Sequence, residues 1–220
     1  CQTMDELSVH RAWPLVRDAL HGPTTCGTML RTEAFKRTAD ELQRLVQQGF
    51  PLDACPHGPS IAWIAAGLGD KYIPLLNSLW WAGANLQQRS QADGSMPIEV
   101  SAAMGHVAVV RRLHSFGCSV GRAVLFAVAE SQSGVLQLLF APPPVGLGIS
   151  PDMRWGGVSP LEFALISANE PVANLLWDVY KVDIVRPLGP GVCKQFGLAR
   201  GSTPLHLCAR LGGGRGEIMR

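Results

Sequence analysis

Residues 201–212 read GSTPLHLCARLG, an order that predicts a short helix with a defined start and end. Thr203 is a favourable N-cap, because its hydroxyl can accept a hydrogen bond from the first turn. Pro204 suits that first turn, where the N–H that proline lacks would have no helical partner. Gly212 suits the far end, since glycine adopts the turn conformation there at little cost. The stretch therefore predicts a capped helix that begins at Pro204.

Two upstream stretches follow the same pattern, GSMPIEVSAAMGH at 94–106 and GVSPLEFA at 157–164. All three have a proline, then an aliphatic residue, then alternating apolar and small residues. After the first of them, the apolar residues of 106–116 recur at steps of three and four, which places them on one face of a second helix. Gly117 follows as its end. The predicted unit is a helix, a tight turn, a second helix, a glycine and an extended connection.

Weaker copies of this unit are found at 28–52, 60–86 and 122–140. The units start near residues 28, 60, 96, 122, 159 and 203, a mean spacing of roughly 35 residues. Such a spacing is typical of stacked helical repeats, in which each helix pair buries its apolar face against its neighbours.

The segment TPLHLCA at 203–209 resembles the ankyrin-repeat signature, and 96–117 resembles a complete ankyrin repeat. The resemblance covers most of 28–212, although the 122–140 unit lacks the Thr-Pro pair. It implies an all-α fold, an α-solenoid of stacked helix-turn-helix repeats with hairpin loops. We expect about six repeats in 28–220, the last truncated, after an N-terminal helical cap or partial repeat at 1–27. We also expect the chain to be a piece of a longer polypeptide.

The resemblance assigns His206 a structural role, in which its ring orders the loop through hydrogen bonds. Glu99 and Glu162 stand at the same position in two other units, which puts the equivalent loop bonds of those units in question. Asp70 and Asn169 precede prolines at the start of the second helices and are expected to cap them.

Composition excludes several classes of function. The chain has 19 basic and 17 acidic residues, a net charge of +2 without a basic stripe, so nucleic acid is not expected as a partner. The most apolar stretches, 60–86 and 123–149, are interrupted by charges or prolines, so no membrane span is expected in this segment. The six cysteines lack C-x-x-C spacing, which favours reduced, mostly buried thiols and an intracellular, cytoplasmic protein.

No catalytic motif stands out in the sequence. G-x-x-x-x-G-K-[ST], G-x-S-x-G and H-E-x-x-H are all absent. Cys55 and His57 could form half of a zinc site, but the other cysteines lack matching spacing. We therefore expect no enzyme activity, no cofactor and no metal.

The expected function is a non-catalytic protein–protein interaction module, a scaffold or adaptor whose partner is another protein. The alternative is a regulatory or substrate-recruiting ankyrin segment of a larger enzyme or channel. A hydrolase with an unrecognised Cys–His site is a third interpretation.

The candidate binding residues lie at a tryptophan pair and in two long connections. In the pair Trp80-Trp81, we expect Trp80 in the core and Trp81 exposed as an anchor. The connections 141–158 and 185–201 either form protruding hairpins that bind a partner or are disordered insertions. They mix apolar and cationic side chains, a combination that suits a protein interface. The candidates are Trp81, Met153, Arg154, Trp155, Lys194, Gln195 and Phe196.

Overall fold

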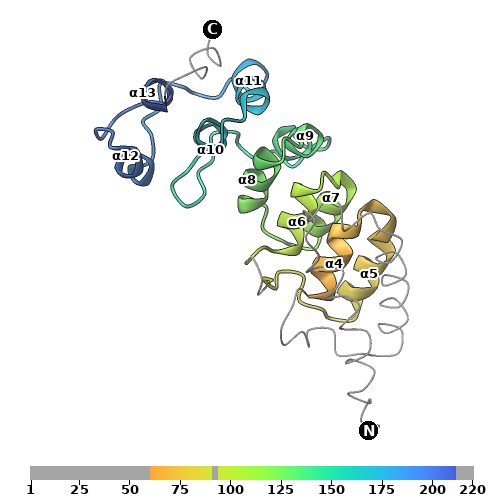
Figure 1. The fold of residues 1–220 in the computed structure, drawn as a ribbon. Coiled ribbons are helices and arrows are strands. Elements are labelled where there is room, and N and C mark those ends of the chain that lie inside the picture. The colour runs from red at the N-terminus through yellow and green to blue at the C-terminus, as the bar shows by residue number, and fades with distance from the viewer. Residues whose placement is uncertain (1–59, 91–93, 212–220) are drawn as a thin grey trace. The chain divides into compact units, whose positions relative to one another are not determined.

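The computed structural model describes residues 60–90 and 94–211, and within these ranges the protein is all-α (Figure 1). The described residues form ten α-helices and one short 3-10 helix, and no strand. The chain divides into two compact units, residues 1–119 and 120–220. The expected all-α class is confirmed for the described ranges, whereas the units expected at 1–27 and 28–52 lie outside them.

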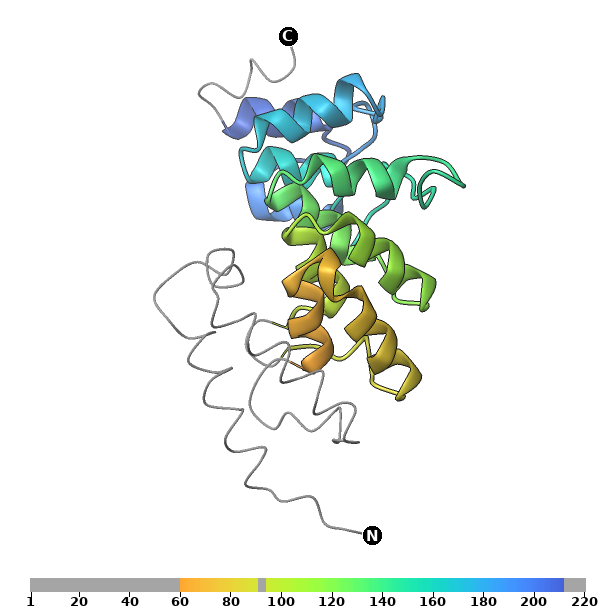
Figure 2. The ribbon, with the colours of Figure 1, turned by 90° about the vertical axis from the view of Figure 1, so that its right-hand side faces the viewer.

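The first unit contains two helix pairs. Its described elements are α4 (Ile61–Leu68), the 3-10 helix η1 (Asp70–Tyr72), α5 (Ile73–Trp81), α6 (Pro97–Ala103) and α7 (Val107–Ser115). The first helices α4 and α6 pack against each other on one side, and the second helices α5 and α7 do so on the other (Figure 2). Apolar residues at helical spacing meet between them, because each helix has one apolar stripe to bury. The fully buried side chains include Ile64, Leu75, Leu76, Leu79, Ile98 and Leu113.

The second unit repeats the pairing and adds two helices. Its described helices are α8 (Gly121–Ala129), α9 (Ser133–Phe140), α10 (Pro160–Ile166), α11 (Glu170–Asp178), α12 (Pro190–Phe196) and α13 (Pro204–Leu211). Helix α8 pairs with α9 and α10 pairs with α11, while α10 also packs against α8 and α13. The core is aliphatic, as in the first unit. Its fully buried side chains include Leu136, Leu139, Leu161, Leu165 and Leu176.

The first helices start where the proline pattern places them. Helices α6, α10 and α13 begin at the prolines of the three strong motifs. The Ser159 hydroxyl caps α10 by accepting a hydrogen bond from the Glu162 N–H at 3.2 Å. Ser60 caps α4 in the same way, accepting from the Trp63 N–H at 3.2 Å. Local cap chemistry therefore sets these helix starts.

Only one of the two expected second-helix caps is confirmed. The Asn169 side-chain oxygen accepts a hydrogen bond from the Val172 N–H at 3.4 Å and caps α11. The prediction for Asp70 was wrong, because Asp70 begins η1, an extra turn ahead of α5. Its carboxylate instead accepts a hydrogen bond from the Val109 N–H of α7, at 3.3 Å. The added turn moves Asp70 away from the start of α5.

The connection at 141–158 folds back onto the end of α9 and then forms a tight hairpin. The N–H groups of Leu147 and Ile149 donate to the carbonyls of Leu138 and Leu139 at 2.8 and 2.9 Å. These bonds satisfy carbonyls at the end of α9 that lack a partner within the helix. Further along, Trp155 and Val158 exchange backbone hydrogen bonds across a two-glycine turn. Both glycines have positive φ, 61° and 85°, which this tight hairpin turn requires.

The expectation of one long connection at 185–201 was wrong, because α12 lies inside it. Pro190 stands at the start of this helix, and Gly197 ends it in the left-handed conformation, with φ 63°. The helix buries Val192 and Cys193. It has only seven residues, and no helix lies at the equivalent place between the other described helix pairs, so the repeating pattern gave no reason to expect it.

Candidate functional site

Glu99, Glu162 and His206 occupy the same position, the third residue of α6, α10 and α13. In each case the side chain accepts a hydrogen bond from the backbone N–H three residues earlier. The distance is 2.9 Å for Glu99, 3.0 Å for Glu162 and 3.2 Å for the Nδ1 of His206. The two carboxylates thus make the loop bond that the imidazole makes, which answers the question raised by the sequence.

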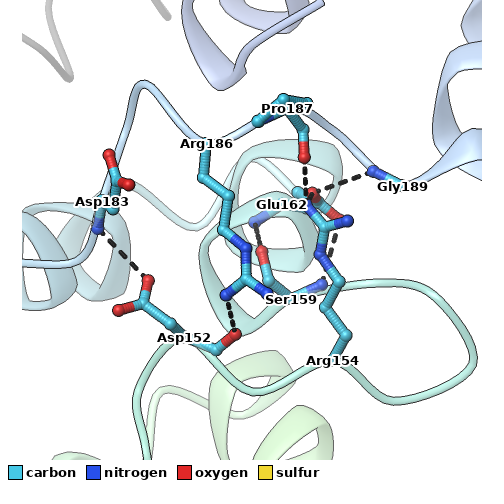
Figure 3. Close-up of polar contacts among 8 residues, drawn as sticks. All are labelled: Asp152, Arg154, Ser159, Glu162, Asp183, Arg186, Pro187 and Gly189. Carbon is cyan, nitrogen blue, oxygen red and sulfur yellow. Dashed lines mark hydrogen bonds and ion pairs between the residues drawn. The ribbon is translucent and has the colours of Figure 1, made fainter. Parts of the chain in front are cut away.

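Glu162 also joins two connections of the second unit (Figure 3). The residue is 1% exposed, and its Oε1 accepts hydrogen bonds from Arg154 Nη2 at 2.9 Å and from the Gly189 N–H at 3.2 Å. The same Arg154 nitrogen donates to the carbonyl of Pro187. A buried carboxylate is stable only with such partners, because it has lost its hydration. Glu162 therefore ties the hairpin before α10 to the segment before α12.

A second set of contacts strengthens this junction. Arg186 Nη1 donates to the Asp152 carbonyl at 2.9 Å, and the Asp183 N–H donates to the Asp152 carboxylate at 3.2 Å (Figure 3). Gly189 approaches the hairpin so closely that a Cβ there would lie 1.9 Å from the carbonyl oxygen of Gly157. Only glycine fits this position, so backbone contact and side-chain bonds hold the two connections together.

The three candidates of the hairpin have different environments. Met153 is half-buried, and Arg154 is engaged inside the chain, so it fixes the hairpin and does not project freely as a binding anchor. Trp155 is 38% exposed. Its ring covers the first turn of α8, where a Cβ on Gly121 would lie 2.3 Å from a ring carbon. The hairpin therefore presents one part of the Trp155 ring and buries the rest.

The other three candidates of the second unit lie on α12 and not on a hairpin loop. Lys194 and Gln195 are exposed, and Phe196, the last helical residue, is half-buried. Helix α12 therefore fixes the backbone from which these side chains project.

Trp81 and its neighbours form an exposed aromatic surface in the first unit. Trp81 is 82% exposed, as expected, but the prediction of a core position for Trp80 was wrong, because Trp80 is 41% exposed. Its ring stacks on Phe116, with centroids 4.8 Å apart and planes at 16°. The Arg112 guanidinium lies 4.6 Å from the Phe116 centroid, and its Nε donates to the Asn77 side chain at 2.7 Å. Trp80, Trp81, Phe116 and Arg112 are called the aromatic surface below.

Helix geometry explains why Trp80 lies outside the core. Helix α5 buries Leu75, Leu76 and Leu79, which together define its inward stripe. Successive helical residues differ by about 100° around the axis, so the residue after Leu79 falls at the edge of this stripe. Phe116, at the end of α7, then covers one face of the indole.

The described cysteines are buried free thiols at positions 118, 193 and 208. Burial raises the pKa of the Cys118 thiol from 9.0 to about 11. Within residues 60–90 and 94–211, no three His, Cys, Asp or Glu side chains gather in a way that could hold a metal ion. The Cys55–His57 pair lies outside the described residues. No helix in the described ranges has the length and apolar character needed to cross a membrane.

No model of a known protein family matches the chain, and no curated protein matches it. The structure itself offers two candidate sites. One is the aromatic surface of the first unit. The other is in the second unit and consists of α12 and the two connections that Glu162 joins.

Proposed function

We propose that the chain is a non-catalytic protein-binding module, a scaffold or adaptor, and that its helix pairs are ankyrin-like repeats. One recurring contact supports the repeats. The His106 ring, at the start of α7, lies 3.1 Å from the carbonyl of Gly67 in α4. Asn169, at the start of α11, donates to the carbonyl of Val128 in α8 at 2.6 Å. The paired residues are 39 and 41 positions apart, so the same type of contact links consecutive helix pairs in both units.

The aromatic surface is the observation that carries the proposed binding function. Tryptophan and arginine are the residues that most often dominate the energy of a protein interface. Trp81 exposes 82% of its surface, and Trp80 beside it is held in place by its stack on Phe116. Because Asn77 and Phe116 fix Arg112 as well, little side-chain entropy remains to be lost when a partner binds.

The test compares Trp81→Ala with Val145→Ala, which removes another large exposed apolar side chain, 67% exposed. Each form of the chain is used to capture partners, and the dissociation constant is then measured with the purified partner. We expect Trp81→Ala to weaken binding by about 30-fold, the size of a hot-spot loss, and Val145→Ala by less than about twofold.

Two further variants, Trp155→Ala and Phe196→Ala, measure what the second unit contributes. Helicity is measured for every variant, because a folded chain is needed for the comparison. Equal capture by the wild-type chain and by Trp81→Ala, with helicity intact, would contradict the role given to the aromatic surface.

A further inference from the structure

Charge is unevenly distributed along the second unit. Residues 184–211 contain four basic side chains, Arg186, Lys194, Arg200 and Arg210, and no carboxylate. The preceding segment, 170–183, contains three carboxylates and one lysine. The positive charge is therefore concentrated on α12, α13 and the turn between them.

Three of these cations gather around the end of α12. Arg210 Nε donates to the Phe196 carbonyl at 3.3 Å, and an Arg210 Nη lies 4.0 Å from where a Cβ on Gly197 would stand. Lys194 lies one turn before Gly197, and the Lys194 carbonyl accepts a hydrogen bond from the Gly197 N–H. Arg200 follows in the exposed turn that leads to α13. Lys194, Arg200 and Arg210 are called the basic face below.

An apolar side chain lies beside this charge. Helix α13 buries Pro204, Leu207 and Cys208, and this places its other residues toward solvent. Leu205, 46% exposed, shares that outer side with Arg210, because residues 205, 206, 209 and 210 form one continuous strip of the helix surface. The basic face therefore combines cations with an exposed aliphatic group.

We propose that the basic face binds an acidic segment of a partner protein, in which carboxylates flank an aliphatic side chain that packs on Leu205. Opposite charges accelerate encounter and select partners, while the apolar contact adds affinity. Lys194 and Arg200 are available for this role, because both residues are exposed. Three cations beside a leucine fit a peptide better than a nucleic acid, whose backbone requires a longer row of positive contacts.

This inference rests on the proposed binding function, but it concerns a different surface and has a separate probe. The probe is a short fluorescein-labelled peptide of glutamate and leucine, titrated with the whole chain and followed by anisotropy. The control peptide has glutamine in place of each glutamate. We expect the acidic peptide to bind at least about tenfold more tightly than the control peptide, with the difference shrinking as salt screens the charges. Equal binding of the two peptides would overturn the proposal.

Variants then locate the site. The double variant Lys194→Glu/Arg200→Glu should lower the affinity for the acidic peptide by at least about tenfold, because two attractive charges become repulsive. The matched control is Lys71→Glu/Arg111→Glu, which reverses two exposed cations of the first unit, and it should change the affinity by less than about twofold. Leu205→Ala should lower the affinity for the acidic peptide by a few-fold, because an apolar contact is lost.

Three results would contradict the proposal. The first is unchanged peptide affinity in the double variant. The second is an equal loss in Lys71→Glu/Arg111→Glu, which would indicate attraction by net charge alone. The third is tighter binding of a single-stranded oligonucleotide, or of anionic lipid vesicles, than of the peptide. Trp81→Ala should leave peptide binding unchanged, so failure here is distinguishable from failure of the aromatic surface.

Discussion

Helices α6 and α10 begin with the same pattern, a proline, an aliphatic residue and a glutamate, but their glutamates have different partners. Glu99 and Glu162 are each 1% exposed, and each bonds the backbone N–H ahead of its own helix. The Arg89 guanidinium lies 4.0 Å from Glu99, on a side chain that is 44% exposed. Glu162 has Arg154 at 2.9 Å, 24% exposed, and also the Gly189 N–H from a distant segment.

The difference shows that one cap can serve two purposes. At α6 the glutamate bonds the backbone of the loop that precedes its helix. At α10 the carboxylate has a second oxygen in use, and that oxygen holds two connections at once. The hairpin at 153–158 and the segment at 186–189 are therefore ordered together, and both depend on a single buried charge.

Loss of that charge should have the largest effect. We expect Glu162→Ala to destabilise the second unit by about 3 kcal/mol, because it removes one partner of a buried ion pair and leaves three N–H donors without their acceptor. Hydrogen exchange of peptides from residues 150–211 measures the local unfolding free energy. Unchanged exchange in these peptides would contradict the claim that Glu162 holds the two connections together.

Removal of the arginine partner should cause the next largest loss of stability. Arg154→Ala should cost about 2 kcal/mol, since Glu162 would remain buried with backbone donors only. The matched change in the first unit, Arg89→Ala, should cost less than about 0.5 kcal/mol, because that arginine is more exposed and further from its carboxylate. Equal losses in the two variants, measured by the same exchange method, would remove the distinction between the two glutamates.

Glu99→Ala should have a moderate effect. The change removes the cap bond to the Met96 N–H, and the Arg89 side chain that loses this carboxylate is 44% exposed. We expect a loss of about 1.5 kcal/mol, half of the loss in Glu162→Ala. Hydrogen exchange in peptides from residues 94–119 gives the value. A loss as large as that in Glu162→Ala would show that the cap itself, and not the junction, carries the energy.

The third cap allows an exchange of residue type. His206 is exposed, and its Nδ1 accepts from the Thr203 N–H. Since a carboxylate makes the same bond in α6 and α10, we expect His206→Glu to change stability by less than about 0.5 kcal/mol, whereas His206→Ala should lose about 1 kcal/mol. Both values come from chemical denaturation. Equal losses in the two variants would mean that a carboxylate does not replace the imidazole at this position.

Local signals made much of the fold predictable. The starts of α4, α10 and α13 follow from a serine or threonine before the helix, and those of α6, α10 and α13 from a proline in the first turn, because these signals act within one turn. Helix α12 escaped prediction since its seven residues fall outside the repeat. The sequence nevertheless contained its boundary signals, Gly189-Pro190 and Gly197.

The site was less predictable, because it depends on distant partners. Glu162 meets Gly189, 27 residues away, and no spacing rule connects them. Arg154 is a residue type that often serves as a binding anchor, but its guanidinium points inward to Glu162. Trp80 is exposed because it is rotated by one residue, about 100° around the axis, from the buried Leu79. The apolar pattern of α5 does not distinguish these two adjacent apolar positions.

The proposed function is that the chain holds a partner protein on its ordered surface without transforming it. Hydrogen exchange of the whole chain with and without a purified partner, read by mass spectrometry, is the test of this function. We predict slower exchange around Trp80, Trp81 and Phe116 when the partner is bound, and recovery of the partner with unchanged mass. Unaltered exchange at these residues, or a partner recovered with an altered mass, would contradict the account.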